Sequence, residues 1–192
     1  MKIRRILIIS AAALITFTAC KNGKTESQTT QTAAQADTTQ REDNNEQELK
    51  INFTMADING NNVTVADEFA RHKITVVDFW ASWCGPCRQE MPGLVKTYND
   101  YKDKGLGIVG VSLDENKEQW TDAISTMNMT WTQLSDLQGW NNSAAKMYGI
   151  QAIPFTIVVD NTGKVIAAGL RGEELTAFIA NRLGTADKAA AQ

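Results

Sequence analysis

The segment VVDFWASWCGPCRQEMP, residues 76–92, carries two of the three cysteines in this 192-residue chain. Cys84 and Cys87 are separated only by Gly85 and Pro86. Such a pair can serve as two ligands of a metal ion, as a structural disulfide (a staple), or as a reactive dithiol. A disulfide that closes so short a loop constrains the unfolded chain little, and small exported folds that depend on staples carry more cysteines than this. The staple is therefore the weakest of the three interpretations.

The residues around the pair favour a reactive dithiol. The run KITVVDFW, residues 73–80, is apolar and β-branched, which predicts a strand buried on both faces. A helix is predicted over 85–103. Cysteines at i and i+3 lie close together on a helix, and the free N–H groups of its first turn stabilise a thiolate. Pro86 suits a first turn, and Trp83 adds a flat apolar surface beside the sulfur.

A metal site is disfavoured by the scarcity of further ligands. Zinc needs two more ligands, and His72 is the only histidine in the chain. Met91 is a lone candidate for copper. We therefore expect no metal, no cofactor beyond the redox-active disulfide, and a surface or loop position for His72. A net charge of −3 without a long Lys/Arg run also argues against nucleic acid as a partner.

The N-terminus has the pattern of an export signal. Residues 1–19 begin with three cations and continue as an apolar run, residues 6–18, that is short for a membrane span. The run ends in FTAC, which resembles a bacterial lipobox with Phe17 at the position where Leu is usual. We predict that Cys20 is lipidated. The alternatives are an ordinary secretory signal and a retained anchor helix.

Composition then divides the rest of the chain. Residues 20–48 are predicted to form the lipidated N-terminus and a disordered tether, because they offer almost no large apolar side chain to bury. An amphipathic helix is the alternative for this stretch. Residues 49–184 are predicted to form one domain, and residues 185–192 a frayed tail.

Hydrophobic patterning predicts strands that alternate with helices. A leading hairpin, residues 51–67, turns at Asn59-Gly60. The predicted strands cover 73–80, 105–113, 130–134, 154–160 and 164–169. The predicted helices cover 85–103, 115–128, 141–147 and 173–184. The order predicts an α/β fold, a three-layer sandwich on a mixed sheet.

The segment VDFWASWCGPC resembles the active-site segment of thioredoxins. The wider pattern resembles the exported, membrane-tethered thioredoxin-like family of ResA and TlpA: a leading β-hairpin, an inserted helix and strand, and CRQEMP, residues 87–92, after the first cysteine. The resemblance covers about residues 49–184. It implies a thioredoxin fold and a thiol–disulfide oxidoreductase whose dithiol is Cys84 and Cys87.

Two acids are candidates for catalytic roles. Asp78 lies inside the apolar strand, where desolvation should raise its pKa, and it matches the buried acid that relays a proton to the resolving thiol of thioredoxins. Many TlpA-like proteins carry Asn there. Glu90 lies at i+3 from Cys87 and matches the acid that tunes the thiols in ResA-like proteins. The alternatives are a solvent-facing acid at a strand end and an exposed surface Glu.

The resemblance also implies a client-binding surface. Pro154 matches the cis proline that packs against the dithiol and presents the backbone of Ile153 to an extended peptide. A trans proline that begins an edge strand is the alternative. Trp83, Gly85 and Pro86 would contact the client as well. The remaining tryptophans outside the motif are expected to pack the core or the insert: Trp120, Trp131 and Trp140. For Trp140 the alternative is a place along a substrate groove.

The expected function is that of an exported reductase for disulfides in extracytoplasmic proteins, with cytochrome c maturation as one candidate process. It would be a monomer, re-reduced by a membrane thiol donor. Lys21 is not the Asp that retains lipoproteins in the inner membrane of enteric-type bacteria, which favours the outer membrane, facing the periplasm. The alternatives are a disulfide oxidase or isomerase, a copper chaperone, and a binding module.

Overall fold

The computed structural model describes residues 48–184. The predicted signal peptide (1–19), the lipidation site at Cys20, almost all of the tether (20–48) and the tail (185–192) lie outside the described residues. The predicted domain, residues 49–184, falls within them.

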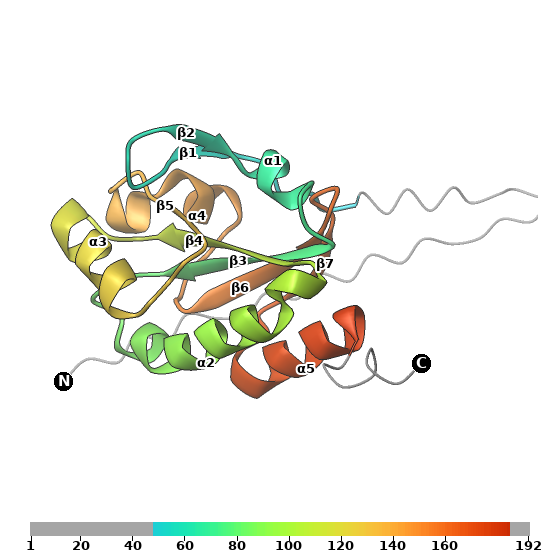
Figure 1. Ribbon diagram of the computed structural model, residues 1–192. Coiled ribbons are helices and arrows are strands. Elements are labelled where there is room, and N and C mark those ends of the chain that lie inside the picture. The colour runs from blue at the N-terminus through green and yellow to red at the C-terminus, as the bar shows by residue number, and fades with distance from the viewer. Residues whose placement is uncertain (1–47, 185–192) are drawn as a thin grey trace, which may run out of the picture. The chain divides into compact units, whose positions relative to one another are not determined.

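A five-stranded mixed sheet forms the centre of the domain (Figure 1), in the order β5-β4-β3-β6-β7. β3 runs parallel to β4, and β4 parallel to β5, whereas β6 and β7 run antiparallel to their neighbours. Every residue of β3 and β4 is buried, as expected for central strands covered on both faces. The bounds are β3 Ile74–Trp80, β4 Leu106–Ser112, β5 Thr132–Leu134, β6 Phe155–Asp160 and β7 Val165–Ala168.

Helices and a hairpin complete the sandwich. α2 and α5 cover one face of the sheet, while α1, α4 and the β1–β2 hairpin lie over the other (Figure 1). The three-layer prediction is confirmed. The helices are α1 Val65–Phe69, α2 Gly85–Tyr101, α3 Lys117–Thr126, α4 Ser143–Met147 and α5 Gly172–Leu183, with 3₁₀ turns η1 Lys102–Lys104 and η2 Gly139–Asn141.

The leading hairpin pairs β1 (Thr54–Ala56) with β2 (Asn62–Thr64). The carboxylate of Asp57 accepts hydrogen bonds from the backbone N–H groups of Asn59 and Asn61, both at 2.8 Å. Gly60 adopts φ +85°, a conformation that glycine reaches without steric cost. The turn predicted at Asn59-Gly60 is confirmed, and its closure depends on Asp57.

Residues 49–57, here called the N-terminal strap, contact both edge strands of the sheet. Near β7, Val165 N–H donates to the carbonyl of Leu49 at 2.9 Å, and Lys50 bridges Lys164. Beside β5, Asp57 bridges Leu134, and Ser135 N–H donates to Ala56 at 3.0 Å. The strap therefore crosses the sheet from one edge to the other.

Candidate active site

The two cysteines lie where β3 passes into α2. Cys84 is the N-cap of α2, and Pro86 occupies its first turn. Cys84 and Cys87 form a disulfide with their Cα atoms 5.3 Å apart. The backbone N–H of Cys87 donates to the Cys84 sulfur at 3.2 Å. A thiolate on Cys84 would thus meet both a donor and the positive end of the helix dipole.

Asp78 lies in the middle of β3, between Gly110 of β4 and Thr156 of β6. Its side chain is buried. Burial, and secondarily the negative charge of Glu90, raise the pKa of Asp78 to about 7. The predicted upward direction is confirmed. A carboxyl group with this pKa can both accept and release a proton near neutral pH.

A small cavity joins the acids to the dithiol. It has a volume of about 30 Å³, which is large enough to admit a water molecule. Asp78, Cys87, Glu90 and Pro154 all line it. The structure therefore brings together four of the residues that sequence reasoning had selected, from β3, from α2 and from the loop before β6.

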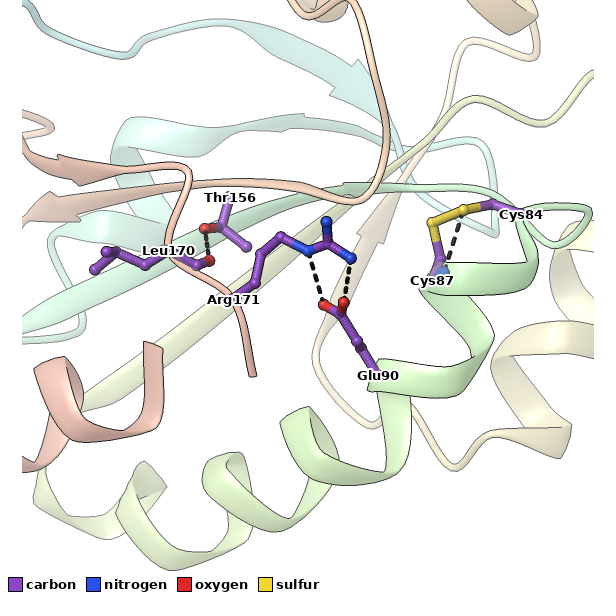
Figure 2. A network of polar contacts seen from close by, with 6 residues as sticks. All are labelled: Cys84, Cys87, Glu90, Thr156, Leu170 and Arg171. Carbon is purple, nitrogen blue, oxygen red and sulfur yellow. Dashed lines mark hydrogen bonds and ion pairs between the residues drawn. A yellow bond between two sulfur atoms is a disulfide. The ribbon is translucent and has the colours of Figure 1, made fainter. Parts of the chain in front are cut away.

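Glu90 is paired with a cation that the sequence analysis missed. Figure 2 shows the Glu90 carboxylate, one turn beyond Cys87 on α2, pointing toward the Arg171 guanidinium. Arg171 Nη2 contacts Oε1, and Nε donates to Oε2 at 3.2 Å. The hydroxyl of Thr156 donates to Leu170 O at 2.5 Å, which fixes the segment that carries Arg171 (Figure 2). No local pattern indicates a pairing between residues 81 apart.

The peptide bond between Ile153 and Pro154 is cis, so that prediction is confirmed. Pro154 directly precedes β6 and borders the cavity beside Cys87. Ile153 is partly buried and packs against the core. Gly85 and Pro86 are both exposed at the start of α2.

Trp83 is exposed next to Cys84, and it has an unexpected neighbour. Trp120 and Trp131 are buried as predicted. Trp140 is not: 47% of its surface is accessible, and its ring centroid lies 6.4 Å from that of Trp83. The expectation that Trp140 packs into the core or the insert was wrong, because η2 holds it at the surface.

A second buried carboxylate, also missed, holds the loop before the dithiol. Asp114 accepts hydrogen bonds from the backbone N–H of Ser82 at 3.0 Å and from its hydroxyl at 2.5 Å. The Ser112 hydroxyl donates to it at 2.6 Å. Asp114 follows a buried strand, and that position was a signal that could have drawn attention to it.

Two properties of residues 48–184 bear on metal binding and on insertion into a membrane. No group of three or more His, Cys, Asp or Glu side chains is placed to hold a metal ion in that range. His72 precedes β3, whereas Cys84 follows it. No helix within the same range is both long and apolar enough to cross a bilayer.

Comparisons with known proteins agree with this geometry. The model of the family described as Redoxin matches residues 31–182. ResA, a thiol-disulfide oxidoreductase of Bacillus thuringiensis, is 29% identical over 64% of this chain and 68% of its own. HelX, a thiol:disulfide interchange protein of Rhodobacter capsulatus, is 36% identical over 60% of this chain and 64% of its own.

Solved structures show the same similarity. The thioredoxin domain of a thiol-disulfide oxidoreductase from Bacteroides vulgatus superposes with a TM-score of 0.64. It is 36% identical, and the match covers 70% of this chain and 95% of that domain.

Proposed function

Because this chain belongs to the redoxin family and is a thiol–disulfide oxidoreductase, we propose that it acts as a reductant of disulfides in exported proteins. The observation that carries the proposal is the Gly85-Pro86 dipeptide, which resembles that of reducing thioredoxins, at the first turn of α2. Cys84 and Cys87 are the redox pair.

The first step is attack by Cys84. Its thiolate displaces one sulfur of a client disulfide, so that a mixed disulfide forms and one client thiolate leaves. The N-cap position and the N–H of Cys87 support the anionic form of this sulfur. Trp83, Gly85 and Pro86 are exposed beside it, and the backbone of Ile153 would pair with the extended client.

The second step is resolution by Cys87. Its thiol must lose a proton before it attacks the Cys84 sulfur and releases the second client thiolate. Asp78, whose pKa is raised to about 7, borders the same cavity and is the proton acceptor. Glu90 raises the pKa of Asp78 and thereby tunes the step. Two electrons pass to the client, and Cys84–Cys87 is left oxidised.

A thiol donor in the membrane would reduce the Cys84–Cys87 disulfide again. A lipid on Cys20 would tether the chain to a membrane that faces the periplasm. Residue 21 is Lys and not Asp, which favours the outer membrane. The protein would work as a monomer. Candidate processes are cytochrome c maturation and the repair of incorrect disulfides. The alternative is a disulfide oxidase on the same fold.

The midpoint potential of the Cys84/Cys87 couple tests the direction. Tryptophan fluorescence in defined thiol/disulfide buffers would report it, since Trp83 adjoins the pair. A value of about −270 mV, as in thioredoxin, supports a reductant, and a value of about −120 mV, as in DsbA, would establish an oxidant instead.

Cysteine variants test the order of attack. Cys84→Ser should abolish turnover of a disulfide-bonded client, because no nucleophile remains to open it. Cys87→Ser should instead accumulate the mixed disulfide, detectable as a covalent adduct on a non-reducing gel. Full turnover by Cys84→Ser would refute the assignment of Cys84 as the nucleophile.

A further inference from the structure

A pair of exposed aromatic rings lies next to the attacking cysteine. Large apolar side chains that are exposed within residues 48–184 are few: Leu49, Ile58, Trp83, Trp140 and Met147. Of these, Trp83 and Trp140 contact each other with an interplanar angle of 54°. Trp83 immediately precedes Cys84, so a client segment bound at Cys84 passes beside these rings.

The two rings border a groove that contains one unpaired charge. The groove has a volume of about 380 Å³, and Leu113, Glu115 and Gln119 are among its other lining residues. Glu115 is its only charged lining residue and forms no ion pair or hydrogen bond with the residues that the structure describes. A Cβ atom at position 139 would collide with the Glu115 carboxylate, so Gly139 makes room for that side chain.

Trp140 is held at the surface by a fixed loop. The carboxylate of Asp136 accepts hydrogen bonds from Asn142 Nδ2 at 2.9 Å and from the N–H of Ser143 at 2.8 Å. Leu137 has φ +57°, which costs free energy for a residue with a branched side chain. The surrounding contacts thus outweigh local strain and keep an aromatic ring in water, which favours a binding role over packing.

The residues that line the groove favour a positively charged ligand. Aromatic faces attract ammonium and guanidinium groups, and a nearby carboxylate adds to the attraction. No basic side chain lines the groove to compete. We propose that the groove bordered by Trp83, Trp140 and Glu115 binds a lysine or arginine side chain of the client, close to the client's reactive cysteine. This inference deepens the proposed function, because it assumes a protein client at Cys84.

Binding can be measured without any redox step. Short capped peptides with alanine in place of the client cysteine, and with lysine, norleucine or glutamate beside it, would be titrated into oxidised ¹⁵N-labelled protein. The lysine peptide should shift the indole N–H signals of Trp83 and Trp140, with a Kd about fivefold below that of the norleucine peptide. Equal affinity for the lysine and norleucine peptides would overturn the proposal.

Matched variants locate the effect. Glu115→Gln should reduce the preference for lysine over norleucine to about twofold or less, whereas Glu118→Gln, which removes the same charge outside the groove, should retain it. Trp140→Ala should weaken binding of the lysine peptide, while Met147→Ala, another exposed apolar residue, should not. Loss of the preference in both glutamate variants would indicate a general field effect and would refute the groove.

The two proposals fail separately. A midpoint potential near that of an oxidant would overturn the reducing direction and leave the peptide titration unaffected. Absence of any lysine preference would overturn the cation groove, whatever the potential.

Discussion

Asp78 is the carboxyl group in the described domain whose protonation depends most on the fold. In the unfolded chain its pKa returns to 3.8, whereas in the folded state it is about 7. Between these values the folded protein holds a proton that the unfolded chain has released. The folded state therefore loses stability as the pH rises from about 4 to 7, by up to about 4 kcal/mol in total.

Asp78→Asn should remove this dependence. The amide cannot ionise, so the variant should gain stability over the wild type as the pH rises from 4 to 7, with a constant difference above that. Urea unfolding of the oxidised proteins at pH 4, 5.5, 7 and 8 measures it. A difference between the two proteins that does not vary with pH would contradict a raised pKa at this residue.

Glu90→Gln should lower the pKa of Asp78. The substitution removes the negative charge that opposes ionisation and leaves the Arg171 guanidinium unpaired, which acts in the same direction. The pKa should stay above the ordinary value, because burial is the larger cause. A ¹³C NMR titration of the Asp78 carboxyl would show the change. The control Glu118→Gln, on α3, should not change the pKa of Asp78.

At this scale, single residues could be predicted where their neighbours in the sequence determine the surroundings of the side chain. Asp78 stands inside an apolar run, and Pro154 directly precedes another apolar run, where the resemblance to thioredoxin-like proteins implied a cis proline. Arg171 was not predictable, because its partner Glu90 is brought near only by the packing of α5 against α2. Trp140 was misplaced for a similar reason: its exposure follows from the loop around Asp136.

Among the elements, the loop between β3 and α2 depends on a neighbouring strand. Asp114, just beyond β4, binds Ser82 through both its backbone N–H and its hydroxyl. The loop that positions Cys84 is therefore anchored to the end of β4 and does not rely on its own local conformation.

Asp114→Ala should destabilise the protein by at least about 3 kcal/mol. It leaves three donors without their acceptor, one on the buried Ser112 and two on the half-buried Ser82, and each unpaired group costs about 1–3 kcal/mol. Urea unfolding would measure the loss, which Asp114→Asn should reduce because one acceptor oxygen remains. Asp122→Ala, at an exposed position of α3, should change stability by less than about 0.5 kcal/mol, and an equal effect of the two alanine variants would contradict the anchoring role.

The identity of each element as a helix or a strand was easier to predict from the sequence than its first and last residues. β3 and β4 were evident from their apolar runs, and the hairpin from Asn59-Gly60. α3 begins at Lys117 and not at 115, because the Asn116 side chain caps it by accepting a hydrogen bond from Gln119 N–H at 2.9 Å. α1 was missed, since five residues are too few to show a helical period.

At the scale of the whole molecule, the proposed attachment to a membrane depends on Cys20, which lies outside the described residues. Cys20→Ala should move the protein from the membrane fraction to the soluble fraction of the cell, because the acyl chains would be lost. Lys21→Ala should leave it with the membrane. Retention of the Cys20→Ala protein in the membrane fraction would favour an uncleaved anchor helix over a lipid.

The N-terminal strap has a consequence for contacts between copies of this protein. An uncovered edge strand offers unpaired N–H and C=O groups onto which another chain can add a strand, and such addition leads to aggregation. By bonding to the start of β7 and to the end of β5, residues 49–57 occupy part of both edges of the sheet. The strap thus protects the domain against edge-to-edge polymerisation, a hazard that grows when many copies are crowded on one surface.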